Sequence, residues 1–189
     1  MSTLLEQYDQ ARAEFDARVS QVGDGQWSAG TPCREWDVRA LVGHLVDEAR
    51  WVPYLLGGGT PADAGDRFDG DPLGADPVAA WHDQSAAATA ALHAEGALDR
   101  AVVLSRGETS ARDYLWELTC DLAVHAWDLA RAIGADERLD PELVRRIYQE
   151  LDKDPAPLGS TPGLFDPPVA VPGHSDLQTQ LLGLYGRRV

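Results

Sequence analysis

Three residues have the types and the spacing that a metal centre needs: His44, Asp121 and His125. Asp121 and His125 are four residues apart, which places both side chains on one face of a helix. That face also carries Leu122 and Leu129, so the pattern predicts that it is buried. Because a buried carboxylate must be paired, protonated or bound to a cation, the spacing suggests two ligands of one metal ion.

His44 supplies the third candidate ligand from another predicted helix. It lies one turn after Leu41 and one turn before Glu48, near the edge of the apolar stripe of that helix. Three protein ligands leave one position of a tetrahedral zinc ion open, which is typical of catalytic sites. The residues alone also allow a metal-free ion pair between Asp121 and His125, or a hydrogen-bonded core histidine.

Four more residues are candidates for proton transfer or for orienting the ligands: Glu48, His82, His93 and Asp128. Among them, Glu48 and Asp128 are the catalytic candidates. His174 lies in a proline-rich tail, where we expect it to be solvated.

Helical periodicity predicts the elements that position these residues. Several predicted helices start at a capping residue, namely Asp37, Asp76 before a proline, and Ser110 three residues before Asp113. Pro53 should bend or break the last turn of its helix. The predicted helices cover residues 3–22, 38–56, 77–95, 111–133 and 141–152, with a short one within 175–185.

The segments between these helices predict little regular structure. Residues 60–76 are rich in Pro, Gly and Asp and contain almost nothing for a core, so we expect a long surface loop. Residues 101–105 are apolar and could form a brief strand, and residues 154–174 hold six prolines, which favours an extended segment.

Long helices with almost no strand signal predict an all-α fold, a four-helix bundle with a proline-rich C-terminal extension. We expect one domain over residues 1–189, with a helical core at about 3–152 and an extended segment at about 153–189.

Composition excludes several classes of function. The net charge of -15 disfavours binding to nucleic acid or to an anionic membrane surface. There is no run of about 18 apolar residues and no secretory leader, so the chain is expected in the cytoplasm. Cys33 and Cys120 form no CxxC motif and are expected to be free thiols in a reducing compartment. The oligomeric state is left open between monomer and homodimer.

Two motifs and the chain end resemble a known family. The segment TPCREWDVRALVGHLV (31–46) carries His44, and DLAVHAWDLARAIG (121–134) carries Asp121 and His125. Together with GLFDPPVAVP (163–172) and LLGLYGR (181–187), they resemble actinobacterial proteins related to the mycothiol-dependent maleylpyruvate isomerase N-terminal domain, within the DinB/YfiT-like superfamily.

This resemblance implies a DinB-type four-helix bundle that holds Zn²⁺, or another divalent ion such as Ni²⁺. The implied ligands are His44, Asp121 and His125, although the isomerase has glutamate at the position of Asp121. It also implies mycothiol as a cosubstrate, whose thiolate would attack an electrophile in S-transfer, conjugation or isomerisation.

Two other hypotheses remain open from the sequence. One is a non-catalytic bundle that binds a metal or a small ligand, as a sensor or accessory protein. The other is a metal-independent biosynthetic enzyme that uses Asp121 and His125 as an acid–base pair. If the chain is instead the thiol transferase or isomerase that the family resemblance implies, the mouth of the bundle and residues 57–76 would select the substrate.

Overall fold

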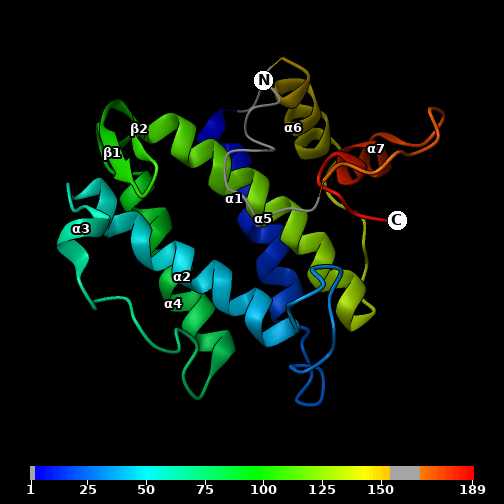
Figure 1. Ribbon diagram of the computed structural model, residues 1–189, viewed down its shortest axis with the longest axis horizontal. Coiled ribbons are helices and arrows are strands. Elements are labelled where there is room, and N and C mark those ends of the chain that lie inside the picture. The colour runs from blue at the N-terminus through cyan, green and yellow to red at the C-terminus, as the bar shows by residue number, and fades with distance from the viewer. Residues whose placement is uncertain (1–2, 154–166) are drawn as a thin grey trace.

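Four long helices form the centre of the protein, in a computed structural model that describes residues 3–153 and 167–189. Helix α1 packs along α5, α2 packs along α4, and α2 also meets α5 (Figure 1). The predicted all-α bundle is therefore confirmed. The four helices are α1 (Leu4–Val19), α2 (Val38–Leu56), α4 (Pro77–Leu92) and α5 (Ala111–Ile133).

Shorter elements surround the bundle. Near the start of α5, strands β1 (Ala101–Leu104) and β2 (Gly107–Ser110) form an antiparallel hairpin, close to α3 (Pro61–Ala64) (Figure 1). A single 3-10 turn, η1 (Ala97–Asp99), precedes this hairpin. Helices α6 (Pro141–Lys153) and α7 (Leu177–Leu184) pack against each other on the side of the molecule away from α3.

The capping residues found in the sequence do start the helices. The side chains of Asp37, Asp76 and Ser110 accept hydrogen bonds from backbone N–H groups at 2.8, 3.0 and 3.0 Å. Of the expectation that Pro53 bends or breaks the last turn of α2, the break is wrong, since the helix continues to Leu56. Pro53 is exposed, so its ring lies on the solvent side of α2, although its missing N–H removes one hydrogen bond of the helix.

Two loop expectations need correction. Residues 60–76 form the short helix α3 and also contribute Leu73, which is 3% exposed and packs against α2 beside Gly43. The strand expected at 101–105 is present, but its partner β2 was not predicted because Gly107–Ser110 is polar. Most of the proline-rich stretch, residues 154–166, lies outside the described residues, and the short helix expected within 175–185 is α7.

The core of the described part lies between the four long helices and extends under α6 and α7. Phe15 of α1 meets Trp81 of α4 edge to face, with ring centroids 4.8 Å apart. Leu181 and Tyr185, near the chain end, belong to the same buried cluster. Among the described helices, none is both long enough and apolar enough to span a bilayer.

Removal of the Ser110 cap should destabilise the protein, because α5 would begin with an unsatisfied backbone N–H. We expect Ser110→Ala to lower the free energy of unfolding by about 1 kcal/mol, measured by urea denaturation. Ser28→Ala is the control, since Ser28 is exposed and lies outside the helices. Equal stability of the two variants would contradict the capping role.

Candidate metal centre

Helix α2 places His44 at the inner edge of the bundle. Asp37 caps the start of the helix, and the buried side chains of Leu41 and Leu45 orient its inner face toward the core. The His44 side chain is 17% exposed, and its Nε2 lies 3.0 Å from Oδ2 of Asp121 on α5. His44 is therefore both a neighbour of Asp121 and accessible from outside the core.

Helix α5 supplies the other two predicted ligands, and all its residues from 118 to 130 are buried. Asp121 Oδ1 lies 3.3 Å from His125 Nε2, one helical turn further along. The candidate ligand atoms of His44, Asp121 and His125 all lie within 4.8 Å of one another. The structure thus brings the three residues together, and their binding of a metal ion stays a prediction.

The Asp121 carboxylate fits the requirements of a metal ligand. Burial would raise its pKa, but the neighbouring charges and hydrogen bonds of His125 and His44 hold it well below its usual range. The carboxylate is therefore ionised at physiological pH. Its buried Oδ1 lies 3.3 Å from His125 Nε2, so an ion bound between the two helices there would be close to both atoms.

The spacing of the ligand atoms also suits a small divalent ion. Zinc–nitrogen and zinc–oxygen bonds of about 2.0–2.2 Å place neighbouring ligands of a tetrahedron about 3.3–3.6 Å apart. The separations of Asp121 from His44 and His125, 3.0 and 3.3 Å, are close to this range. Without a metal, burial lowers the His125 pKa, but the Asp121 charge outweighs it and raises that pKa well above its usual value. A proton and a cation therefore compete for the same position.

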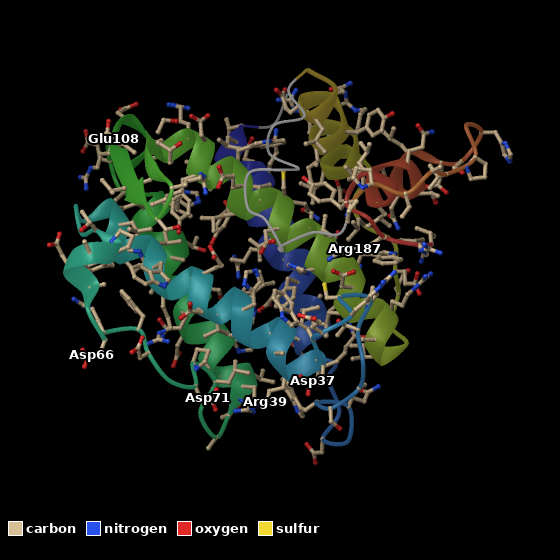
Figure 2. All side chains as sticks on the ribbon, in the orientation of Figure 1. Asp37, Arg39, Asp66, Asp71, Glu108 and Arg187 are labelled. Carbon is tan, nitrogen blue, oxygen red and sulfur yellow. The ribbon has the colours of Figure 1, made fainter. Side chains whose placement is uncertain are left out.

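The second ring nitrogen of His125, Nδ1, contacts the carboxylate of Asp128. His125 Nδ1 lies 2.9 Å from Asp128 Oδ2, and both side chains are fully buried. Arg187, near the chain end, donates to both oxygens of Asp128, at 3.0 Å from Nε and 2.6 Å from Nη2. Figure 2 shows Arg187 over the C-terminal half of α5. This arrangement fixes the ring so that Nε2 faces Asp121, which is how carboxylates orient metal-binding histidines.

Cys33 lies beside the same group of residues. Its Sγ is 3.3 Å from Asp128 Oδ2, 3.8 Å from His125 Nδ1 and 2.9 Å from Arg187 Nη2. Although Cys33, His125 and Asp128 are close enough to share a cation, the Arg187 guanidinium already lies among them and would repel it. Only the group of His44, Asp121 and His125 therefore remains a candidate metal centre, and Cys33 is part of its surroundings.

Both cysteines are free thiols, as the sequence predicted. Cys120 is buried in α5, and burial raises its pKa to about 12, so it stays protonated and unreactive. The roles of Cys33 and Arg187 beside Asp128 were missed. The only sequence signal was that each falls within a segment of the family resemblance.

A cavity of about 360 Å³ opens beside the candidate metal centre, between α2, the start of α5 and the hairpin. Glu48 lies in its wall, and burial raises the pKa of this carboxyl to about 7. The same wall contains His44 and Asp121, so a metal ion at the centre would be reached from the cavity. The remaining lining residues are Trp51, Leu55, Pro61, Leu104, Ser105, Arg106, Tyr114, Glu117 and Leu118.

The other predicted candidates lie elsewhere. His82 and His93, both on the α4 side of the bundle, are exposed and face Asp16 and Asp9 of α1 at 3.2 and 3.0 Å. His174 is exposed, as expected. These three histidines therefore take no part in the site, whereas Glu48 and Asp128 do lie next to it.

Comparisons with known proteins show the family of this chain and its fold. Residues 8–130 match the family described as the mycothiol maleylpyruvate isomerase N-terminal domain. Two proteins from Mycobacterium tuberculosis strains, both named as uncharacterized, are each 32% identical to this chain over 140 residues, or 72% of this chain and 70% of theirs.

Two solved structures resemble the fold. They are crystal structures of the mycothiol-dependent maleylpyruvate isomerase and of a histidine-to-alanine mutant of it, with TM-scores of 0.61 and 0.62. Each is 16% identical in sequence, and the match covers 80% of this chain and 72% of the other. At this identity the similarity establishes the fold only.

Loss of Arg187 should strongly destabilise the protein, because it leaves the buried Asp128 carboxylate with less compensating charge. We expect Arg187→Gln to lower the free energy of unfolding by about 3–5 kcal/mol in urea titrations. Arg188→Gln is the matched control, since the Arg188 side chain is exposed, and it should cost less than about 0.5 kcal/mol. Similar losses in both variants would show that the Asp128 pair does not matter.

Glu48 should make the stability of the metal-free protein depend on pH. Its pKa of about 7 in the folded protein exceeds the value of 4.5 for a free carboxyl, so the folded state loses stability as pH rises through this range. We therefore expect Glu48→Gln, in the presence of a chelator, to be more stable than wild type by about 1–3 kcal/mol at pH 8 and nearly equal at pH 4.5.

The matched control for this pH dependence is Glu95→Gln, at an exposed position after α4. It should change the free energy of unfolding little at either pH. A stability difference between wild type and Glu48→Gln that is the same at both pH values would refute the raised pKa.

Proposed function

The chain belongs to the family of the mycothiol maleylpyruvate isomerase N-terminal domain, and we propose that it is a metal-dependent enzyme that activates a low-molecular-weight thiol. The reaction class is S-transfer to an electrophile or thiol-assisted isomerisation. Mycothiol is the proposed thiol for two reasons. The description of the family contains its name, and the solved isomerase that shares the fold is a mycothiol-dependent enzyme. A reducing cytoplasm would suit both this cosubstrate and the free Cys33 thiol.

The observation that carries this proposal is the position of the three candidate ligands at the wall of a cavity. His44 and Asp121 line the cavity, and His125 lies behind them against Asp128. A divalent ion, Zn²⁺ or another such as Ni²⁺, would stabilise the deprotonated sulfur of a thiol that enters from the cavity. The protein residues then have to orient the ligands, accept the thiol proton and keep the electrophile in place.

Glu48 is suited to accept the thiol proton. Its carboxyl lies in the wall of the same cavity, one helical turn from His44, and its raised pKa of about 7 means that both protonation states occur near neutral pH. Asp128 acts differently, as a positioning residue, because it touches His125 Nδ1 and is closed off from the cavity by burial. Thus one of the two catalytic candidates from the sequence is proposed for proton transfer and the other for orientation.

A second candidate function is favoured by the same contacts. Asp121 lies between His44 and His125 in an arrangement that is also stable as a metal-free ion pair, which could work as an acid–base pair. A non-catalytic metal-binding bundle is the third. Activity that survives chelation would support the acid–base enzyme, and metal binding without turnover would support the non-catalytic bundle.

Metal binding is tested by elemental analysis of purified protein loaded with Zn²⁺. We expect about one ion per chain in wild type and less than about 0.2 in His44→Ala, Asp121→Asn and His125→Ala, because each loses one of three ligands. His82→Ala should retain the full content, since His82 faces α1 and not the centre. Unchanged stoichiometry in all three ligand variants would remove the proposed centre.

Turnover is tested with mycothiol and monobromobimane. Zinc-loaded protein should accelerate thiol conjugation at least about tenfold over the uncatalysed rate, and chelation or Asp121→Asn should abolish the acceleration. If Zn²⁺ binds but no thiol is consumed faster, the non-catalytic bundle is favoured instead.

A further inference from the structure

One tryptophan contacts both histidines of the candidate metal centre. The ring centroid of Trp36 lies 4.8 Å from that of His44 and 5.6 Å from that of His125, at interplanar angles of 38° and 40°. The two imidazoles in turn meet edge to face, with centroids 5.4 Å apart. The three rings therefore form one packed group, in which the indole restricts how either imidazole can turn.

His44 needs this support more than His125 does. The Nδ1 atom of His125 contacts the buried Asp128 carboxylate, which holds that ring from the side away from Asp121. Within the described parts of the chain, Nδ1 of His44 has no equivalent carboxylate, and the polar contact of this ring runs from Nε2 to Asp121. A single hydrogen bond does not fix the plane of an imidazole, so the packing of Trp36 restrains the His44 ring.

Trp36 is itself fixed by a hydrogen-bonded turn. Its backbone N–H donates to the Cys33 carbonyl at 2.8 Å, and its own carbonyl accepts from the backbone N–H and the hydroxyl of Thr31, at 3.2 and 2.9 Å. The turn leads directly into Asp37, which caps α2, and the Cys33 thiol anchors it to Asp128 on α5. The indole therefore has a firm support that is attached to both ligand-bearing helices.

We propose that Trp36 is a positioning residue of the candidate metal centre, on the basis of the ligands proposed above. Its ring holds both imidazoles in the orientation in which their Nε2 atoms face the Asp121 carboxylate, at 3.0 and 3.3 Å. The indole N–H is a donor only, so Trp36 acts through the histidines and not as a ligand. For His44, an aromatic ring takes the place of the carboxylate or carbonyl that usually orients a metal-binding histidine.

This role has a consequence for the affinity of the centre. Ligands that are already oriented lose little conformational freedom when an ion binds, whereas loosely held ligands must be ordered at that moment. Loss of a group that orients a metal ligand weakens metal affinity by about 10–100-fold in other proteins. We therefore expect a flat ring at position 36, and not merely an apolar side chain, to be required for tight binding.

The requirement for a ring is tested by comparing Trp36→Leu with Trp36→Phe. Both new side chains are apolar and smaller than the indole, but only phenylalanine keeps a flat ring against the imidazoles. The Kd of the full chain for Zn²⁺ is measured by competition with a chromophoric chelator. We expect it to rise at least about tenfold in Trp36→Leu and to stay within about threefold of wild type in Trp36→Phe.

Trp27→Leu is the matched control. Trp27 is also half-buried, lies in the same segment before α2 and packs against the core, but it has no ring contact with either histidine in the described structure. This variant should keep the wild-type Kd, even if it is less stable in urea. Equal Kd values in wild type and Trp36→Leu would overturn the proposal, and so would an equal loss of affinity in Trp36→Leu and Trp27→Leu.

Cobalt reports on the orientation of the ligands separately from affinity. The visible absorption of Co²⁺ is strong in tetrahedral and weak in octahedral surroundings, so it is sensitive to the geometry of the bound ion. At saturating Co²⁺, Trp36→Leu should absorb more weakly than wild type, because loosened imidazoles admit additional water. Trp36→Phe and Trp27→Leu should keep the wild-type spectrum. A wild-type spectrum in Trp36→Leu would show that the imidazoles stay oriented without the indole, and would refute the proposal.

The outcomes separate this role from the proposed centre. If wild type binds Zn²⁺ and Co²⁺, and Trp36→Leu matches it in Kd and in spectrum, the role of Trp36 fails while the centre stands. If wild type binds neither ion, the proposed centre fails, and the role of Trp36 fails with it.

Discussion

The Asp121 carboxylate is ionised and 6% exposed in the middle of a helical core, and the packing of α2 against α5 depends on how its charge is compensated. His44 reaches it from α2 and His125 from the next turn of α5, so the two helices meet through a polar contact inside an apolar interface. A buried charge is costly unless it is paired or coordinated. This requirement fixes the relative position of the two helices at the point where the cavity opens.

The same requirement extends toward the chain end. His125 is held by Asp128, whose own buried charge is compensated by Arg187, and Cys33 completes the group from the segment before α2. Four separate parts of the chain therefore meet around one imidazole ring. The last residues of the chain, including the buried Tyr185, are consequently part of the site's support and not only a cover for the bundle.

Family membership and local chemistry give different kinds of information about function. The family match supports mycothiol-dependent chemistry as a proposal, whereas the candidate metal centre rests on the positions of His44, Asp121 and His125 in this chain. Aspartate at position 121, where the isomerase resemblance implies glutamate, is shorter by one methylene. Here it is reached by two histidines at 3.0 and 3.3 Å, so the shorter side chain still brings the three candidate ligands together.

The sequence by itself determined the long helices, their caps and the pairing of Asp121 with His125, because periodicity, capping and one-turn spacing are local properties. Only the tertiary structure decided what these helices meet. Arg187 and Asp128 are 59 residues apart, and no local rule links them. The polar strand β2 and the buried Leu73 likewise depend on a surface that other elements provide. The opening of the centre toward an acidic, largely apolar cavity follows from how α2, α5 and the hairpin pack, which no segment specifies alone.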